Sequence, residues 1–294
     1  MLTVRDWQEQ DTDWWVGLRR RWDPTKSDTQ LRVLAAGRIG RFIARRVALD
    51  DGRPVGMAFV LEPVLPGTAT SVIVEPLARG RGVGSMLWAD IVATAGQEPL
   101  LTFVPDRDEH SVAVGQRWGF STVTRAISSR LDLRGPLPEP NLPVGMRIKV
   151  ISGADPEADA KGLDGLIADT GDFPGAQEMG WAGNHMAFSR LFSDITWVLV
   201  LDGDTVASAA SLSAYAGPGG SEWAVVFTGT RPAYRGRGLS RAAKQALHQL
   251  AARRGAAGVV TMNDAANSGI RALNASLGYR AVGGELRMLR PGRQ

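Results

Sequence analysis

Two short turns rich in arginine and glycine are the part of this sequence best suited to chemistry. They read ARGRGVG at residues 78–84 and YRGRGLS at residues 234–240, and each comes directly before a segment with a helical pattern. Glycine lets a backbone approach a ligand closely, and the free amides and dipole at a helix start attract phosphate. The turns therefore predict two phosphate sites, with arginine charge beside each.

The expected phosphate contacts come from both turns. They are Arg79, Gly80, Arg81, Gly82, Val83 and Gly84 in the first, and Arg235, Gly236, Arg237, Gly238, Leu239 and Ser240 in the second. Serine is small and tolerated at a helix start, so it is an acceptable replacement for glycine at the last position. Neither turn has the Gly-Lys-Ser/Thr of a Walker loop, and neither follows the first strand of a βαβ unit, as dinucleotide-binding glycines do.

The turns belong to a long internal repeat. Arg79 matches Arg235 at an offset of 156 residues, and Phe120 matches Tyr279 at an offset of 159. Both copies predict the same order of elements: an Asp-Gly hairpin, a strand, the turn, a helix, a strand, a second helix and a Gly-aromatic ending. Pro76 and Pro232, before the turns, and Thr102 and Thr261, after them, match at the same offsets. Four landmarks in one order at nearly one offset indicate two duplicated domains.

A proline-rich segment, LRGPLPEPNLP, separates the two copies and predicts a semi-rigid linker. We expect an N-terminal domain at residues 1–135, the linker at 136–145 and a C-terminal domain at 146–294. A chain of 294 residues is long enough for two such domains. Each domain is expected to be α+β, with a mixed, mostly antiparallel sheet flanked by helices.

Composition narrows the chemistry further. The chain has no cysteine, which excludes disulfides, thiolate zinc sites and a cysteine nucleophile. His, Asp and Glu residues show no metal-ligand spacing, so we expect no metal. The start of the chain lacks a signal-peptide pattern, and no apolar run reaches the roughly 18 residues of a membrane span. We therefore expect a cytoplasmic protein without a membrane partner.

The isoelectric point of about 9.8 raises the question of a nucleic-acid partner. The formal net charge is only +4, and four of the 34 lysines and arginines are lysine. Such an arginine bias is typical of a GC-rich genome, and no strand face interleaves basic and aromatic residues. We expect no nucleic-acid partner.

The order of elements around the turns resembles the GNAT superfamily of acetyl-CoA-dependent N-acetyltransferases. The family signature, Gln/Arg-x-x-Gly-x-Gly/Ala, lies between the fourth strand and the third helix. Residues 79–84 match it fully, and residues 235–240 match it apart from the final serine. The resemblance covers nearly the whole chain as a tandem pair. It implies two GNAT-like domains in which the strand before each turn splays away from its central neighbour.

The resemblance also implies roles for residues. In the family the turn amides hold the diphosphate of the cosubstrate acetyl-CoA, and a backbone amide near the end of the preceding strand polarises the thioester carbonyl. By position these amides belong to Val74 and Thr230. Each such donor is worth roughly 3–4 kcal/mol in acyl transfer. The acceptor amine then attacks directly, without a covalent enzyme intermediate.

Candidates for proton transfer follow from the same comparison. The family often uses a glutamate about eleven residues before the signature, where this chain has Thr68 and Ala224. Glu222 lies two residues further back on the same strand face and is the candidate base; it is also interpretable as a loop residue at a strand end. Glu62 is a less well placed candidate. Gly115 and Asn274 stand where the family often has its tyrosine acid, so no acid is identified.

The second half carries more polar residues after its turn. Asn267 and Asn274 lie seven residues apart on one helical face and resemble a GNAT subgroup whose asparagines contact the cofactor, although Asn267 also suits a helix cap. Asp108 and Gly115 hold these positions in the first half. We therefore expect the C-terminal half to be catalytic. Residues 169–188, which include His185, are the candidate lid over the acceptor.

These inferences predict an acyltransferase that moves acetyl from acetyl-CoA to a primary amine of a small molecule. A protein amine is an alternative acceptor. A non-catalytic acyl-CoA-binding module, such as a sensor or partner protein, is the alternative from another class. A monomer and a homodimer both remain open.

Overall fold

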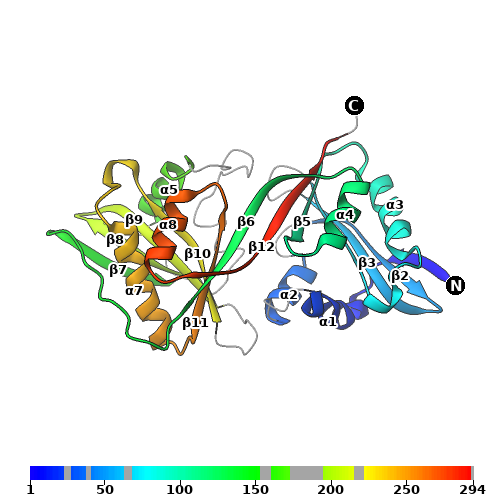
Figure 1. Ribbon diagram of the computed structural model, residues 1–294, viewed down its shortest axis with the longest axis horizontal. Helices are drawn as coiled ribbons and strands as arrows, with labels where there is room; N and C mark the ends of the chain where they lie inside the picture. Colours follow the sequence, from blue (N-terminus) through cyan, green and yellow to red (C-terminus); the bar gives the residue numbers. More distant parts are fainter. Residues whose placement is uncertain are drawn as a thin grey trace. The chain divides into compact units, whose positions relative to one another are not determined.

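The computed structural model describes residues 1–22, 28–37, 41–62, 68–152, 160–172, 195–214 and 222–292. The chain divides into two compact units: unit 1 holds Met1–Arg125 and Glu285–Gln294, and unit 2 holds Ala126–Gly284. Each unit combines a mostly antiparallel sheet with helices (Figure 1). The expected α+β fold class is therefore confirmed.

Unit 1 contains β1 (Leu2–Asp6), α1 (Thr12–Trp22), α2 (Asp28–Ala35), β2 (Phe42–Asp50), β3 (Arg53–Leu61), β4 (Thr68–Val74), α3 (Val83–Ala95), β5 (Leu100–Pro105), α4 (Glu109–Arg117) and the end of β12 (Arg280–Arg290). Its strands lie in the order β1-β2-β3-β4-β5-β12. The β4–β5 pair is parallel and the other neighbours are antiparallel. Asp51 and Gly52, both at positive φ, form the predicted Asp-Gly hairpin turn.

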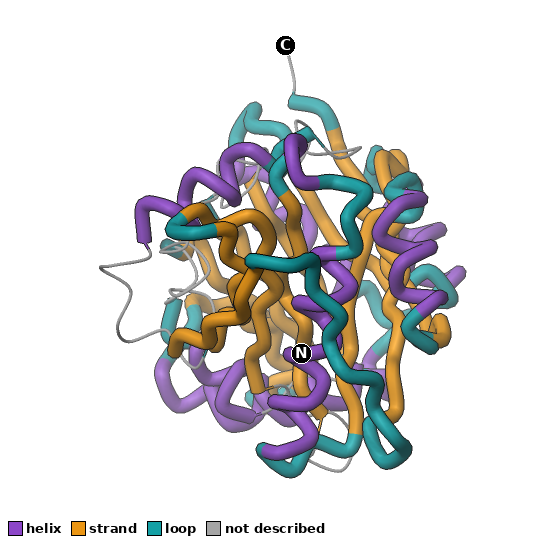
Figure 2. Tube along the Cα trace, turned by 90° about the vertical axis from the view of Figure 1, so that its left-hand side faces the viewer, coloured by secondary structure: helices purple, strands orange, loops and turns teal. Residues whose placement is uncertain are grey.

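Unit 2 contains β7 (Met146–Ser152), α5 (Ala160–Asp169), β8 (Thr196–Asp202), β9 (Thr205–Ala214), β10 (Glu222–Thr230), α7 (Leu239–Arg253), β11 (Gly258–Asp264), α8 (Ser268–Ser276) and most of β6 (Ser121–Asp132). The strand order is β6-β11-β10-β9-β8-β7, with a parallel β10–β11 pair. Alternate residues of β8 join two core clusters, Val198 with α7 and Trp197 with α5. Strand β8 thus packs against a helix on each face, which explains why its residues 197–201 are all apolar and buried. Figure 2 draws the helices in purple beside the strands in orange.

The last strand of each sequence repeat belongs to the other unit. Residues 285–290 of β12 pair antiparallel with β5 in unit 1, where red β12 lies beside β5 in Figure 1. Residues 126–132 of β6 pair with β11 in unit 2. The contact units thus differ from the sequence repeats at these two strands. The proline-rich segment lies in unit 2, where Leu137 and Leu142 pack against the core.

The core of unit 2 holds a lysine. Lys244 of α7 is fully buried, and its Nζ lies 4.7 Å from the centre of the Tyr279 ring. Burial lowers the pKa of Lys244 to about 7. His248, one helical turn further on, is buried with its Nε2 2.7 Å from the Tyr279 hydroxyl. Burial and the Lys244 charge lower the pKa of His248 to about 3.

In unit 1, aromatic rings occupy the positions that correspond to this buried lysine and tyrosine. Trp88 and Phe120 occupy the positions that correspond to Lys244 and Tyr279, and their ring centres lie 5.6 Å apart. Trp88 also stacks on Trp118 at 4.8 Å. The buried amine is therefore a feature of the second repeat and not of the fold.

We predict that Met288→Ala loosens unit 1, although Met288 lies in the second sequence repeat. Met288 is fully buried against Leu100, Val104 and Phe120, so its truncation should cost about 2–5 kcal/mol. Hydrogen exchange should accelerate in β5 and stay unchanged in β11. Val282→Ala, at an exposed position of the same strand, is the control. Faster exchange confined to β11 would contradict the assignment of this strand to unit 1.

We also predict that Lys244→Met raises the melting temperature at pH 7. Between about pH 7 and the ordinary lysine pKa of 10.5, the unfolded chain holds a proton at Lys244 that the folded chain has lost. Stability therefore rises with pH over this window, and below it the penalty is present in full. The advantage of the methionine variant should shrink as pH rises from 7 to about 10. Lys161→Met, at an exposed position of α5, is the control, and an advantage that does not change with pH would contradict the lowered pKa.

Candidate functional site

Both turns place their glycines in the left-handed region. The φ angles of Gly80 and Gly82 are 74° and 83°, and those of Gly236 and Gly238 are both 77°. A Cβ built at any of the four would have no atom within 4 Å. Glycine is therefore required by the backbone conformation and not by crowding.

The helix starts keep their amides available. Gly82 and Gly238 are the N-cap residues of α3 and α7, and neither helix has a side-chain cap. The first intrahelical bonds run from Met86 and Ala242 back to these glycines, so the amides before them have no helical acceptor. Val83 and Leu239, the residues after the glycines, are buried and fix each helix start in the core. The predicted phosphate sites have the backbone geometry that an anion requires.

The strand before each turn separates from its parallel neighbour. In unit 2 the β10–β11 pairing runs from Glu222 to Val225, although β10 continues to Thr230. The register of β10 against β9 shifts between Val225 and Phe227, which marks a bulge. In unit 1 the β4–β5 pairing covers Thr68 and Ala69, although β4 continues to Val74. The expected splay is confirmed within the described strands.

The backbone of Thr230 faces the opening between β10 and β11. Arg231 donates its amide to Ala207 of β9 at 3.0 Å. Because neighbouring residues of a strand direct their amides to opposite sides, the Thr230 N–H points away from β9. Val74 has the same position in unit 1, since Glu75 donates to Val55 at 2.8 Å. Both predicted carbonyl-polarising amides thus lie where the strands separate.

The first arginine of each signature turns back onto its own strand. Arg235 donates through Nε to the Thr230 carbonyl at 3.2 Å, and its two terminal nitrogens each lie 2.6 Å from a carboxylate oxygen of Asp172. Hydrogen bonds from Arg235 lower the pKa of Asp172. Arg79 makes the matching bond to the Val74 carbonyl at 3.4 Å. These arginines brace the turn against the strand end, and the charge of Arg235 is balanced.

The second arginines differ between the units. Arg81 forms an ion pair with Asp50 of β2 at 2.7 Å. Arg237 lies over the ring of Tyr234 at 5.3 Å and donates to the Ala233 carbonyl at 3.4 Å. Each turn therefore has one signature arginine paired with a carboxylate, Arg81 in the first and Arg235 in the second.

A chain of three hydroxyls supports the second turn. Ser208 donates to the Gly229 carbonyl at 2.7 Å, and its oxygen lies 2.8 Å from that of Thr230, which in turn lies 2.6 Å from that of Ser240. Each hydroxyl has one proton. Because Ser208 uses its own on Gly229, Thr230 must donate to Ser208 and Ser240 to Thr230. Strand register and signature alignment place Gly56, Val74 and Gly84 at these positions in unit 1.

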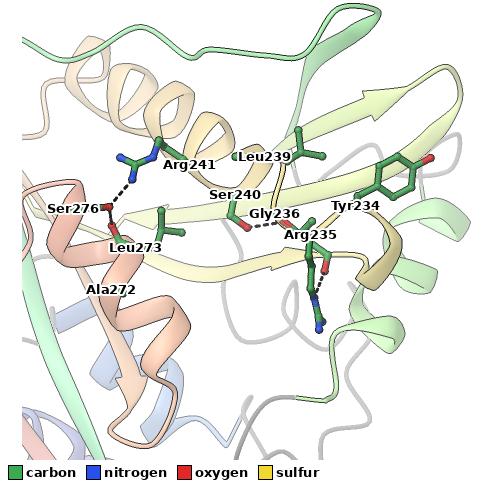
Figure 3. Close-up of a pocket in the computed structure, with 11 residues that line it drawn as sticks. Tyr234, Arg235, Gly236, Leu239, Ser240, Arg241, Ala272, Leu273 and Ser276 are labelled. Atoms are coloured by element: carbon green, nitrogen blue, oxygen red, sulfur yellow. Dashed lines mark hydrogen bonds between the residues drawn. The ribbon is translucent and has the colours of Figure 1, made fainter.

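A cavity of about 500 Å³ lies beside the second turn. It is bounded by the end of β10, the turn, the start of α7 and the outer face of α8 (Figure 3). Its lining residues are Thr230, Tyr234, Arg235, Gly236, Gly238, Leu239, Ser240, Arg241, Ala272, Leu273 and Ser276. The cavity therefore joins the helix-start amides to the end of the strand that carries the Thr230 amide.

The two asparagines of the second half have different positions. Asn267 caps α8, where its Oδ1 accepts from the Ile270 amide at 3.2 Å, as Asp108 caps α4. Asn274 is buried, and its Nδ2 donates to Asn263 at 2.7 Å. Its buried Oδ1 has no partner within the described part of the chain. The role of either residue toward a cofactor stays a prediction.

The acid–base candidates are only partly described. Glu222 is the first residue of β10, in register with Gly258 of β11. Glu62 forms an ion pair with Arg41, which lowers the pKa of Glu62 and makes it a poorer base. Residues 173–188 of the expected lid, His185 included, lie outside the described residues.

Among the described residues, no His, Asp and Glu side chains gather in a group suited to hold a metal ion. No helix in the same ranges has the length and apolar character needed to cross a membrane.

Two curated proteins match part of the sequence. A mycothiol acetyltransferase from Nocardiopsis dassonvillei is 32% identical over 130 residues, which cover 41% of this chain and 38% of that protein. A mycothiol acetyltransferase from Thermobispora bispora is 31% identical over 136 residues, covering 46% and 44%. The chain thus spans less than half the length of the curated relatives it matches.

Solved structures match over the full length. A tandem GNAT protein from the clavulanic acid biosynthesis pathway superposes with a TM-score of 0.80 at 19% identity, covering 98% of both chains. A GCN5-related N-acetyltransferase from Sphaerobacter thermophilus gives 0.77 at 17% identity, covering 100% and 97%. At these identities the likeness shows the fold.

The family comparison covers both repeats. The model of the Acetyltransferase (GNAT) family matches residues 3–120 and again residues 168–279, so each match contains one glycine turn, one pair of separating strands and one Gly-aromatic ending. The chain belongs to the GNAT family of acetyltransferases, as a tandem member.

Proposed function

We propose that this protein transfers the acetyl group of acetyl-CoA to a primary amine of a small molecule. One observation carries the proposal: free helix-start amides and an inward-facing strand amide border the same cavity in unit 2. The first set suits the diphosphate of a carrier. The second suits a carbonyl oxygen on which negative charge develops.

The chemistry follows from these positions. Acetyl-CoA would supply an acetyl group activated as a thioester. The amides of residues 238–240 would hold the diphosphate, and the Thr230 N–H would donate to the thioester oxygen. Glu222 would accept the proton that the attacking amine loses, directly or through water. Formation of the C–N bond and cleavage of the C–S bond then leave a thiolate, which takes a proton from solvent.

Unit 2 is the proposed catalytic unit. Its turn is supported by the hydroxyl chain of Ser208, Thr230 and Ser240, and it borders the cavity. The corresponding positions at the first turn hold Gly56, Val74 and Gly84, which have no hydroxyl. Unit 1 then serves as a scaffold or as a second carrier site, and the variants below separate these roles.

The acceptor is proposed by class. Two relatives are mycothiol acetyltransferases, so a mycothiol-related amine is the first acceptor to assay, followed by a panel of small amines and by peptides with free amines. We further propose a cytoplasmic location.

The rival proposal is a non-catalytic acyl-CoA-binding module. It draws support from the buried Asn274, which stands where the family often has its tyrosine acid. Thiol release from acetyl-CoA with any amine supports the enzyme, and coenzyme A binding without turnover across the panel supports the module.

We predict that Gly238→Asp weakens coenzyme A binding at least tenfold, because it places a carboxylate where the diphosphate should lie. Aspartate and asparagine both tolerate positive φ, so Gly238→Asn is the uncharged control and should weaken binding much less. Calorimetry gives the affinities. Gly82→Asp tests the first turn in the same way. Loss of binding in Gly82→Asp together with unchanged binding in Gly238→Asp would contradict the assignment to unit 2.

We predict that Glu222→Gln lowers kcat by about 10²–10⁴ and leaves coenzyme A affinity unchanged. Glu62→Gln should leave both unchanged, because Glu62 is held in an ion pair with Arg41. The pH–rate profile of the Glu222 variant should lose its acidic limb. A profile identical to that of the wild type would remove Glu222 from the role.

A further inference from the structure

The two arginines on the cavity wall differ in how their charge is balanced. Arg235 is held by both oxygens of Asp172. Arg241, on the first turn of α7, donates to the hydroxyl of Ser276 at 2.8 Å, and no carboxylate within the described ranges pairs with it. Figure 3 shows Arg241 reaching across from α7 to Ser276 at the end of α8. Arg241 is thus a cationic side chain on the cavity wall whose described hydrogen-bond partner is the neutral hydroxyl of Ser276.

The matching positions in unit 1 hold the same two residue types in reverse. At the offset of the turns, Arg241 corresponds to Ser85 of α3. At the offset of the Gly-aromatic endings, Ser276 corresponds to Arg117 of α4. All four side chains belong to exposed residues, so packing does not dictate their identity. Each unit therefore pairs one arginine with one serine. In unit 2 the arginine is near the start of α7 and the serine ends α8, whereas in unit 1 the serine is near the start of α3 and the arginine ends α4.

The position of this pair separates it from the diphosphate site. Arg241 follows the N-cap Gly238 by three residues, which is about 4.5 Å along the helix axis. Ser276 is the last residue of α8, on the other wall of the cavity. The turn amides suffice for one anionic group. A guanidinium with unused donors beside a hydroxyl suits a second one, and arginine binds phosphate oxygens in this way.

Coenzyme A has such a second group, since its ribose carries a 3′-phosphate apart from the diphosphate. We propose that Arg241 and Ser276 bind this 3′-phosphate and make the cavity select coenzyme A over dephospho-coenzyme A. The inference rests on the proposed function and adds a specificity-determining pair to it. It assigns Arg241 to carrier selection and not to acetyl transfer.

Calorimetry with coenzyme A and dephospho-coenzyme A tests the pair, in a Gly82→Asp background that confines binding to unit 2. The parent should bind coenzyme A about tenfold or more tightly than dephospho-coenzyme A, the range expected for a charge-assisted hydrogen bond. Arg241→Ser should lower the affinity for coenzyme A to that for dephospho-coenzyme A and leave the latter nearly unchanged. The double exchange Arg241→Ser with Ser276→Arg, which copies unit 1, should restore most of the preference.

Arg253→Ser is the matched control. It removes the same charge from the same helix, twelve residues or roughly 18 Å from Arg241, and should keep the preference. Equal weakening of both ligands by Arg241→Ser would overturn the proposal, because it would place the contact at the diphosphate. Equal binding of both ligands by the parent would overturn it as well, with the proposed function intact. Binding of neither ligand would instead remove the proposed function and this inference together.

Discussion

Backbone amides without helical acceptors, at the starts of α3 and α7, are the feature on which the rest of each unit depends. A serine or asparagine cap would ordinarily take up one such amide. Gly82 and Gly238 occupy the cap position without a side chain, and their left-handed conformation turns the chain into the helix. The loss relative to a better cap is only a few tenths of a kcal/mol, and burial of Val83 and Leu239 offsets it. The amides are thus kept for a ligand at little expense to the fold.

The opening between the parallel strands depends on the same turn. Each strand that leads into a turn stops pairing with its parallel neighbour before its last residue. In β10 the pairing with β11 ends at Val225, where a bulge follows, while the pairing with β9 continues to Thr230. The signature arginine then ties the last carbonyl of the strand to the turn. The turn amides and the strand amide are consequently fixed relative to one another, so the proposed carrier, held at the turn, would have its thioester placed at the strand amide.

Local patterns predicted much of this arrangement. The Asp-Gly hairpins and the glycine turns are encoded by short stretches in which glycine supplies positive φ angles that other residues rarely adopt. The exchange of β6 and β12 was not predictable in the same way, because the two repeats are similar and either terminal strand fits either sheet by its pattern. The hydroxyl chain is not predictable from the sequence, because Ser208 lies on a neighbouring strand, 22 residues before Thr230, and no local pattern joins it to Ser240. Lys244 was unexpected for another reason: a lysine in an alanine-rich helix ordinarily faces water.

The two repeats differ in the side chains at matching core and turn positions, and the differences indicate in which unit the residues serve more than stability. A fully buried lysine with no hydrogen-bond partner among the described residues destabilises a core, and unit 1 shows that tryptophan fills the same position. The hydroxyls of unit 2 likewise stand where unit 1 has glycine and valine. Selection for folding alone would favour the apolar set in both copies. Retention of the polar set in unit 2, the unit whose turn borders the cavity, therefore supports the proposal that this copy is the catalytic one.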